Sequence, residues 1–119
     1  RTGYLYEISY PSYHRARWRR TQQQCWNLQL YHADVLNPEV QIHWNKPFDF
    51  VFIDGMKSQY AEYIHTIRPF CSSGATIVAD DVRVYENKMD ALWIYLKDHH
   101  ISYNIVDLSD GDGVLVFTV

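Results

Sequence analysis

Short strand-like segments alternate with helical segments along the whole chain, and this alternation limits the possible folds more than any other feature. The predicted strands are rich in aliphatic, aromatic and β-branched residues and cover 3–8, 27–31, 48–54, 75–80, 102–108 and 114–119. Helices are predicted between them over 9–24, 58–68 and 85–99. The alternation predicts an α/β fold with a mostly parallel sheet and helices on both of its faces.

Local signals agree with this assignment. Pro11 stands in the first turn of the first predicted helix, where proline is tolerated. The third predicted helix carries one apolar stripe at spacings of three and four, formed by Met89, Leu92, Trp93 and Leu96. The turn sequence DGDG at 110–113 joins the last two strands closely enough to predict an antiparallel hairpin. A chain of 119 residues suits one domain with a core, so a single domain is predicted over 1–119.

The composition excludes several classes of protein. Hydrophobic residues make up 47% of the chain and charged residues 21%, which is typical of a globular domain rather than a disordered one. The apolar runs are too short to span a membrane, and no secretory signal is visible, so a cytoplasmic protein is expected. The chain begins at Arg1 rather than at Met, so the question of whether a segment upstream is missing stays open.

Cysteine and arginine give weaker signals. Cys25 and Cys71 fit neither a disulfide framework nor a zinc site, and we expect both to be reduced thiols in the core. The net charge of −3 makes nucleic acid an unexpected partner. Four arginines in the first predicted helix could contact phosphate, but a solvated helix face is the favoured interpretation: Arg15, Arg17, Arg19 and Arg20.

Acidic residues lie at or just after the carboxyl ends of the first four predicted strands. They are Glu7, Asp34, Asp54, Asp80 and Asp81. Any one of them could be a helix N-cap, because Asp is common at strand-to-helix junctions. Five together favour a binding site, since ligands of open α/β sheets bind outside the carboxyl ends of the strands.

The residue types at this edge suggest metal-assisted chemistry. Carboxylates from neighbouring strand ends, Asp54, Asp80 and Asp81, suit a hard divalent cation such as Mg²⁺. Such a cation lowers the pKa of a coordinated hydroxyl. Lys57, three residues after Asp54, could act as a base if partial desolvation lowers its pKa. The alternative for Lys57 is a surface salt bridge with Asp54, which contributes little.

Three stretches also resemble a known family: FDFVFIDGMKSQY at 48–60, GATIVADDV at 74–82 and DGDGVLVFTV at 110–119. They look like the cation-dependent O-methyltransferases of the catechol and caffeoyl-CoA type, which use S-adenosylmethionine, and the resemblance runs from Gly3 to Val119. It implies a Rossmann-like methyltransferase fold and methyl transfer to a hydroxyl of a small catechol-like diol.

The resemblance also implies roles for individual residues. It places Glu7 on the cofactor ribose and Asp34 on the adenine amino group, with Asp54 also near the cofactor. It makes Asp54 and the Asp80–Asp81 pair the ligands of a divalent cation, and Lys57 the base that takes the hydroxyl proton.

One family feature is absent from the sequence. The glycine-rich cofactor loop after the family's first strand has no counterpart, so the resemblance describes an N-terminally truncated fold. Three explanations stay open: a fragment of a longer protein, a partner segment or second copy that fills the gap, or a new strand order.

Two functions also stay open. The retained Asp54, Lys57, Asp80 and Asp81 favour an O-methyltransferase, whereas the absent loop favours a non-catalytic binding or assembly module derived from one.

Overall fold

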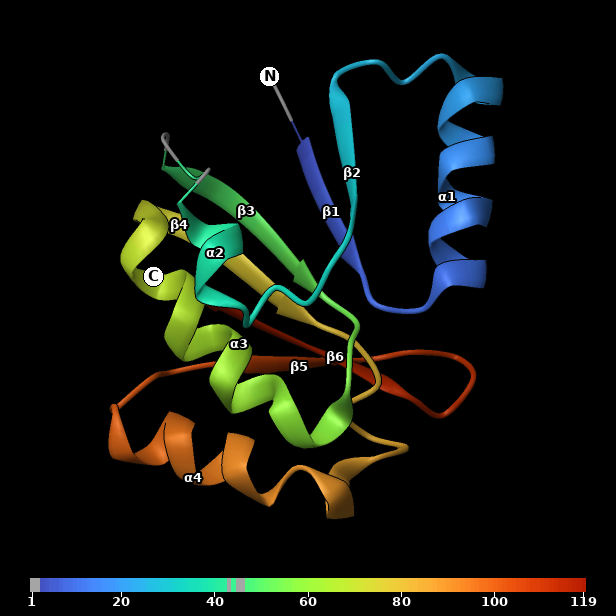
Figure 1. Cartoon of the computed structure of the whole chain (residues 1–119). Helices are drawn as coiled ribbons and strands as arrows, with labels where there is room; N and C mark the ends of the chain where they lie inside the picture. Colours follow the sequence, from blue (N-terminus) through green and yellow to red (C-terminus); the bar gives the residue numbers. More distant parts are fainter. Residues whose placement is uncertain (1–2, 43, 45–46) are drawn as a thin grey trace. The chain divides into compact units, whose positions relative to one another are not determined.

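The strands of the chain pair into two sheets, one in each of two compact units, Arg1–Trp44 and Asn45–Val119 (Figure 1). The computed structural model describes residues 3–42, 44 and 47–119. Within these residues no strand joins the two sheets. The prediction of a single domain over 1–119 stays a prediction.

The first unit is a strand–helix–strand element. β1 (Gly3–Glu7) and β2 (Leu28–His32) pair in parallel, and the helix α1 (Tyr10–Gln23) connects them. Pro11 occupies the first turn of α1 as predicted, and the helix ends at Gln24, whose φ of 55° is left-handed. A short helix, α2 (Pro38–Gln41), follows and is capped by the side chain of Asn37.

The second unit contains a four-stranded mixed sheet in the order β3-β4-β6-β5. β3 (Phe48–Ile53) and β4 (Cys71–Ala79) are parallel neighbours, with Val51 opposite Ile77. β5 (Asn104–Asp107) and β6 (Gly113–Thr118) form the predicted antiparallel hairpin, and β6 inserts between β4 and β5. The predicted adjacency of the strands at 48–54 and 75–80 is therefore confirmed.

The helices of the second unit are shorter than predicted. The predicted helix 58–68 is divided into η1 (Lys57–Gln59), α3 (Tyr60–Ile67) and η2 (Arg68–Phe70). The predicted helix 85–99 begins as the 3₁₀ turn η3 (Glu86–Lys88), and α4 (Asp90–Asp98) starts only at Asp90. Asp90 in the first turn of α4 is favourable because it faces the positive end of the helix dipole.

The core of the second unit lies between the sheet and the packed pair α3 and α4. The predicted stripe is confirmed for Met89, which directly precedes α4, and for Leu92 and Leu96, since each is 1% exposed. The fourth member, Trp93, is only half-buried and lines a hollow instead. The three buried members pack with other fully buried residues from α3 and the sheet: Tyr60, Ile64, Ile77 and Leu115.

Two further expectations concern single features. The prediction that Cys25 is a core thiol is wrong, because Cys25 is exposed in the turn after α1, while Cys71 at the start of β4 is half-buried. Cys25 lies beyond the last turn of α1 and lines a hollow whose other lining side chains are mostly polar or charged, which leaves its thiol exposed. None of the helices in the described part of the chain has the length and hydrophobicity needed to cross a membrane.

Candidate functional site

Three carboxylates converge at the carboxyl ends of β3 and β4. Asp54 directly follows β3, and Asp80 and Asp81 directly follow β4. One carboxylate oxygen from each of the three lies within 4.8 Å of the other two. The convergence follows from the parallel pairing, because parallel neighbours end at the same edge of a sheet.

Lys57 lies among these carboxylates. Its ammonium group donates to Oδ1 of Asp54 at 3.1 Å, to Oδ2 of Asp81 at 2.6 Å and to the hydroxyl of Tyr60 at 3.0 Å. Its side chain is only 19% exposed, whereas Asp54 is 50% exposed and Asp81 30%. Lys57 therefore holds the acidic cluster together from the side of η1 while the carboxylates keep one face open to solvent.

The electrostatics of the cluster are unevenly balanced. Partial burial lowers the pKa of Lys57, but the hydrogen bonds to Asp81, Tyr60 and Asp54 outweigh it and raise that pKa above its ordinary value of 10.5. The Lys57 ammonium lowers the pKa of Asp81, but partial burial and the neighbouring carboxyls of Asp112 and Asp80 raise it by more. The single ammonium of Lys57 therefore does not fully compensate the negative charges of the neighbouring carboxylates. A second cation would bind favourably under this condition.

Two tyrosines to which the sequence assigned no role, Tyr60 and Tyr85, contact Lys57. Tyr60 is fully buried, and its hydroxyl accepts from Lys57 and donates to the backbone oxygen of Asp80 at 3.0 Å. The Lys57 ammonium also lies 5.3 Å from the centre of the Tyr60 ring and 5.5 Å from that of Tyr85. The only advance signal for Tyr60 is its place three residues after Lys57.

Asp112 fixes the loop that follows the cluster. The sequence indicates only a turn residue at Asp112, but in the structure Asp112 is just 8% exposed. Its Oδ1 atom accepts the backbone N–H groups of Arg83 and Val84 at 3.1 Å each and that of Gly113 at 2.8 Å. Burial alone raises the pKa of Asp112, but these donors lower it below its ordinary value. Asp112 therefore anchors the chain directly after Asp81, which has a left-handed φ of 63°.

Gly55 allows the turn between Asp54 and Lys57 to pass close to α3. A Cβ atom at this position would lie 2.9 Å from ring and hydroxyl atoms of Tyr63. The Tyr63 hydroxyl also accepts the backbone N–H of Met56 at 3.3 Å. The glycine is needed for this close approach.

Glu7 and Asp34 belong to the first unit. Glu7 ends β1, and its Oε1 accepts the backbone N–H of Ser9 at 3.0 Å. Asp34 lies two residues after β2, and its Oδ1 accepts the N–H of Leu36 at 2.9 Å. Both carboxylates thus lie near the carboxyl edge of their own parallel pair, and each holds a local turn as a capping residue does.

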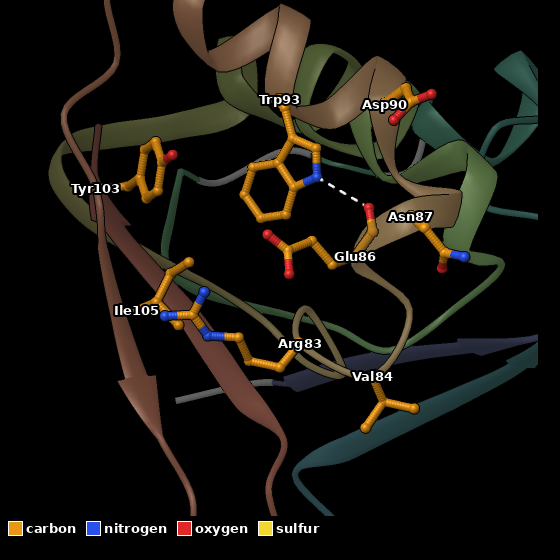
Figure 2. Close-up of a pocket in the computed structure, with 8 residues that line it drawn as sticks. All are labelled: Arg83, Val84, Glu86, Asn87, Asp90, Trp93, Tyr103 and Ile105. Atoms are coloured by element: carbon orange, nitrogen blue, oxygen red, sulfur yellow. Dashed lines mark hydrogen bonds between the residues drawn. The ribbon is translucent and has the colours of Figure 1, made fainter.

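A hollow of about 810 Å³ on the second unit shares no lining residue with the acidic cluster. Figure 2 shows the rings of Trp93 and Tyr103 on its walls, with the side chains of Glu86 and Arg83 below them in this view. The Trp93 indole donates to the backbone oxygen of Glu86 at 3.2 Å, and Arg83 pairs with Asp107 at 3.0 Å. The charged groups of this hollow are therefore of both signs.

No family model matches the chain. Solved structures match it at low sequence identity. An O-methyltransferase from Bacillus cereus in complex with S-adenosylhomocysteine has a TM-score of 0.81 at 20% identity, over 99% of this chain and 62% of that one. The O-methyltransferase TomG from Streptomyces achromogenes, in complex with S-adenosylmethionine, has a TM-score of 0.72 at 20% identity, over 98% of this chain and 61% of that one.

A methyltransferase from Podospora anserina bound to S-adenosylhomocysteine has a TM-score of 0.76 at 18% identity, over 95% of this chain and 58% of its own. The chain spans about three fifths of the length of these structures. The predicted α/β methyltransferase-like fold is confirmed.

Proposed function

We propose that the chain carries the metal-binding and proton-accepting part of an S-adenosylmethionine-dependent O-methyltransferase acting on a small catechol-like diol. The observation that carries the proposal is the convergence of Asp54, Asp80 and Asp81 around Lys57. The fold agrees with it, because the similar structures from Bacillus cereus and Streptomyces achromogenes, which contain S-adenosylhomocysteine and S-adenosylmethionine, are O-methyltransferases.

The donor set of the cluster fits a divalent cation. Asp54, Asp80 and Asp81 would hold it, since carboxylate oxygens are the ligands that Mg²⁺ prefers and the three groups lie within reach of one ion. When bound there, such a cation would hold the two oxygens of a diol, lower the pKa of a bound hydroxyl and neutralise the carboxylates that raise the pKa of Lys57.

Lys57 would accept the hydroxyl proton as the methyl group arrives. Its ammonium is protonated while it is bonded to Asp54 and Asp81, because those contacts raise its pKa. Tyr60 accepts from the ammonium and is itself fixed on the backbone oxygen of Asp80, so it would keep Nζ in place when the carboxylate contacts weaken. The side chain of Lys57 is only 19% exposed, which limits the access of water to its amine.

Glu7 and Asp34 would bind the cofactor, Glu7 at the ribose hydroxyls and Asp34 at the adenine amino group. Each of the two uses one carboxylate oxygen on a local backbone N–H. The other oxygen of each carboxylate would accept the cofactor's donor.

The test is methyl transfer to a catechol with S-adenosylmethionine and Mg²⁺, combined with calorimetry of cofactor binding. The 119-residue chain and any longer natural form of it are measured side by side. We expect Lys57→Ala to lower turnover by about two to four orders of magnitude, the usual share of a positioned base, while leaving cofactor affinity unchanged. Lys97→Ala, which removes an exposed ammonium from α4, is the matched control.

The outcomes separate the two functions. Binding by the longer form alone would show that this chain is one part of a larger cofactor site. Absence of S-adenosylmethionine binding by both forms would overturn the enzyme proposal and leave a non-catalytic module derived from a methyltransferase.

A further inference from the structure

The helix α1 has no buried residue along its 14 positions. It carries four arginines and no acidic residue. Among the described residues none of these arginines forms an ion pair. A helix with this exposure and this excess of positive charge presents an unneutralised surface, and charge complementarity points to an anionic partner.

The arginines of one face line a hollow of about 400 Å³ along α1 and the start of β2. Arg15, Arg19 and Arg20 share this face with the polar side chains of Ser12 and Gln23, and no carboxylate lines the hollow. Their spacing of four and five residues places the three guanidinium groups on neighbouring turns.

Arg20 has an unused donor at the wall of this hollow. One terminal nitrogen, NH1, donates to the backbone oxygen of Leu28 at 3.1 Å, which fixes the side chain. The Nε atom of the same guanidinium is buried and has no hydrogen-bond acceptor among the described residues. Leaving a buried charged donor unpaired is unfavourable, so a shift of the Arg20 side chain toward an oxygen-rich ligand in the hollow would give this donor an acceptor.

Two large aromatic side chains lie beside these arginines and are open to solvent. Trp18 and Trp26 are each 64% exposed. Trp18 follows Arg15 by three residues on the helix, and the Arg20 guanidinium lies 5.8 Å from the centre of the Trp26 ring. Exposed aromatic rings next to positive charges are the surface on which single-stranded nucleic acids stack their bases.

The overall charge of −3 hides an uneven distribution. Residues 1–44 contain five arginines and three carboxylates, whereas residues 45–119 contain six basic and eleven acidic residues. The first unit is therefore positive on its own.

A lipid surface suits α1 less well, because a membrane-surface helix needs a broad apolar face and α1 has none.

We propose that α1 and the turn after it bind single-stranded nucleic acid, with phosphates at Arg15, Arg19 and Arg20 and bases stacked on Trp18 and Trp26. This surface shares no residue with the acidic cluster at Lys57. It carries out no chemical step and holds a polyanion by charge and stacking.

The experiment is fluorescence anisotropy of a labelled single-stranded RNA of about 20 nucleotides, titrated with the full 119-residue chain between 50 and 200 mM salt. We expect dissociation constants of about 1–100 μM near physiological salt, with steep salt dependence. Replacing Arg15→Gln and Arg19→Gln together should lower the salt slope by about 1.4, since each phosphate contact to a single strand contributes about 0.7. Trp18→Ala should weaken binding by about tenfold through lost stacking.

The matched control is the double variant Lys88→Gln and Lys97→Gln, which removes two positive charges from the second unit. It should leave the affinity and the salt slope unchanged. All variants should keep the melting temperature of the parent chain, because neither arginine nor Trp18 is buried.

Three results would overturn the proposal. The first is no RNA binding at 50 mM salt. The second is an equal loss of affinity in the arginine and lysine double variants, which would indicate non-specific attraction. The third is binding only to phosphatidylserine vesicles or to millimolar inorganic phosphate, which would assign the arginines to a lipid surface or a small anion instead.

Discussion

The ammonium group of Lys57 lies 2.6 Å from Oδ2 of Asp81, a residue that is 24 positions away in the chain. This contact joins the start of η1 to the residue pair after β4. It also places a positive charge where we propose that a divalent cation binds, so Lys57 and the cation compete for the same carboxylates.

Metal binding should therefore respond to Lys57 in a defined direction. Millimolar Mg²⁺ or Ca²⁺ should raise the melting temperature of the chain by mass action. A metal concentration of 100 times Kd would increase the free energy of unfolding by about 2.7 kcal/mol. Lys57→Gln should bind the cation more tightly, because the competing ammonium is gone, and Asp81→Asn more weakly. Calorimetric titration measures both, with Asp98→Asn as a control in an exposed acid of α4. No shift with either metal would leave helix capping as the better account of the acids.

Asp112 should give the chain part of its stability at neutral pH. Its pKa is lowered in the folded state, so the stabilisation is present above about 3.8, its ordinary value, and is lost as the pH falls through the lower folded-state value. Asp112→Asn should lower the melting temperature at pH 7 and make the loss of stability on acidification shallower. Thermal denaturation followed by circular dichroism from pH 2 to 7 measures this. An unchanged acid profile would contradict the role given to Asp112.

Gly55 should not tolerate a larger residue. A methyl group there would lie 2.9 Å from Tyr63, so either the ring or the turn before Lys57 must move. We expect Gly55→Ala to destabilise the chain by about 1–3 kcal/mol, the usual cost of overpacking. Ser109→Ala in an exposed loop is the control. Equal urea midpoints for the two variants would show that Tyr63 moves without penalty.

The two cysteines should differ in reactivity. Cys25 is exposed, whereas burial raises the pKa of the Cys71 thiol and so lowers its thiolate fraction at any given pH. Iodoacetamide at pH 8 should modify Cys25 first, and mass spectrometry of the digested chain identifies the site. Cys25→Ser should leave only slow labelling. Faster labelling of Cys71 would mean that β4 opens at its start.

The sequence was sufficient to predict the parts of the site that depend on local order. Strand-like runs that each end on an acid predict parallel neighbours with their carboxylates at one edge, and Asp54, Asp80 and Asp81 meet there. The approximate bounds of β3 and of the hairpin follow from the same patterns, because strand propensity and turn residues act over a few positions. The starts of α3 and α4 were less predictable, since short 3₁₀ turns replace the first residues of both helices.

Only the tertiary structure decided which residues support that edge. Asp112 looks like a turn residue until its contacts with the N–H groups of Arg83 and Val84, almost thirty residues away, are known. The burial of Tyr60, the exposure of Cys25 and the lack of an acceptor for Arg20 Nε among the described residues likewise depend on what packs around them. Burial and hydrogen-bond partners are set by segments distant in the chain, and a pattern of neighbouring residues carries no information about those segments.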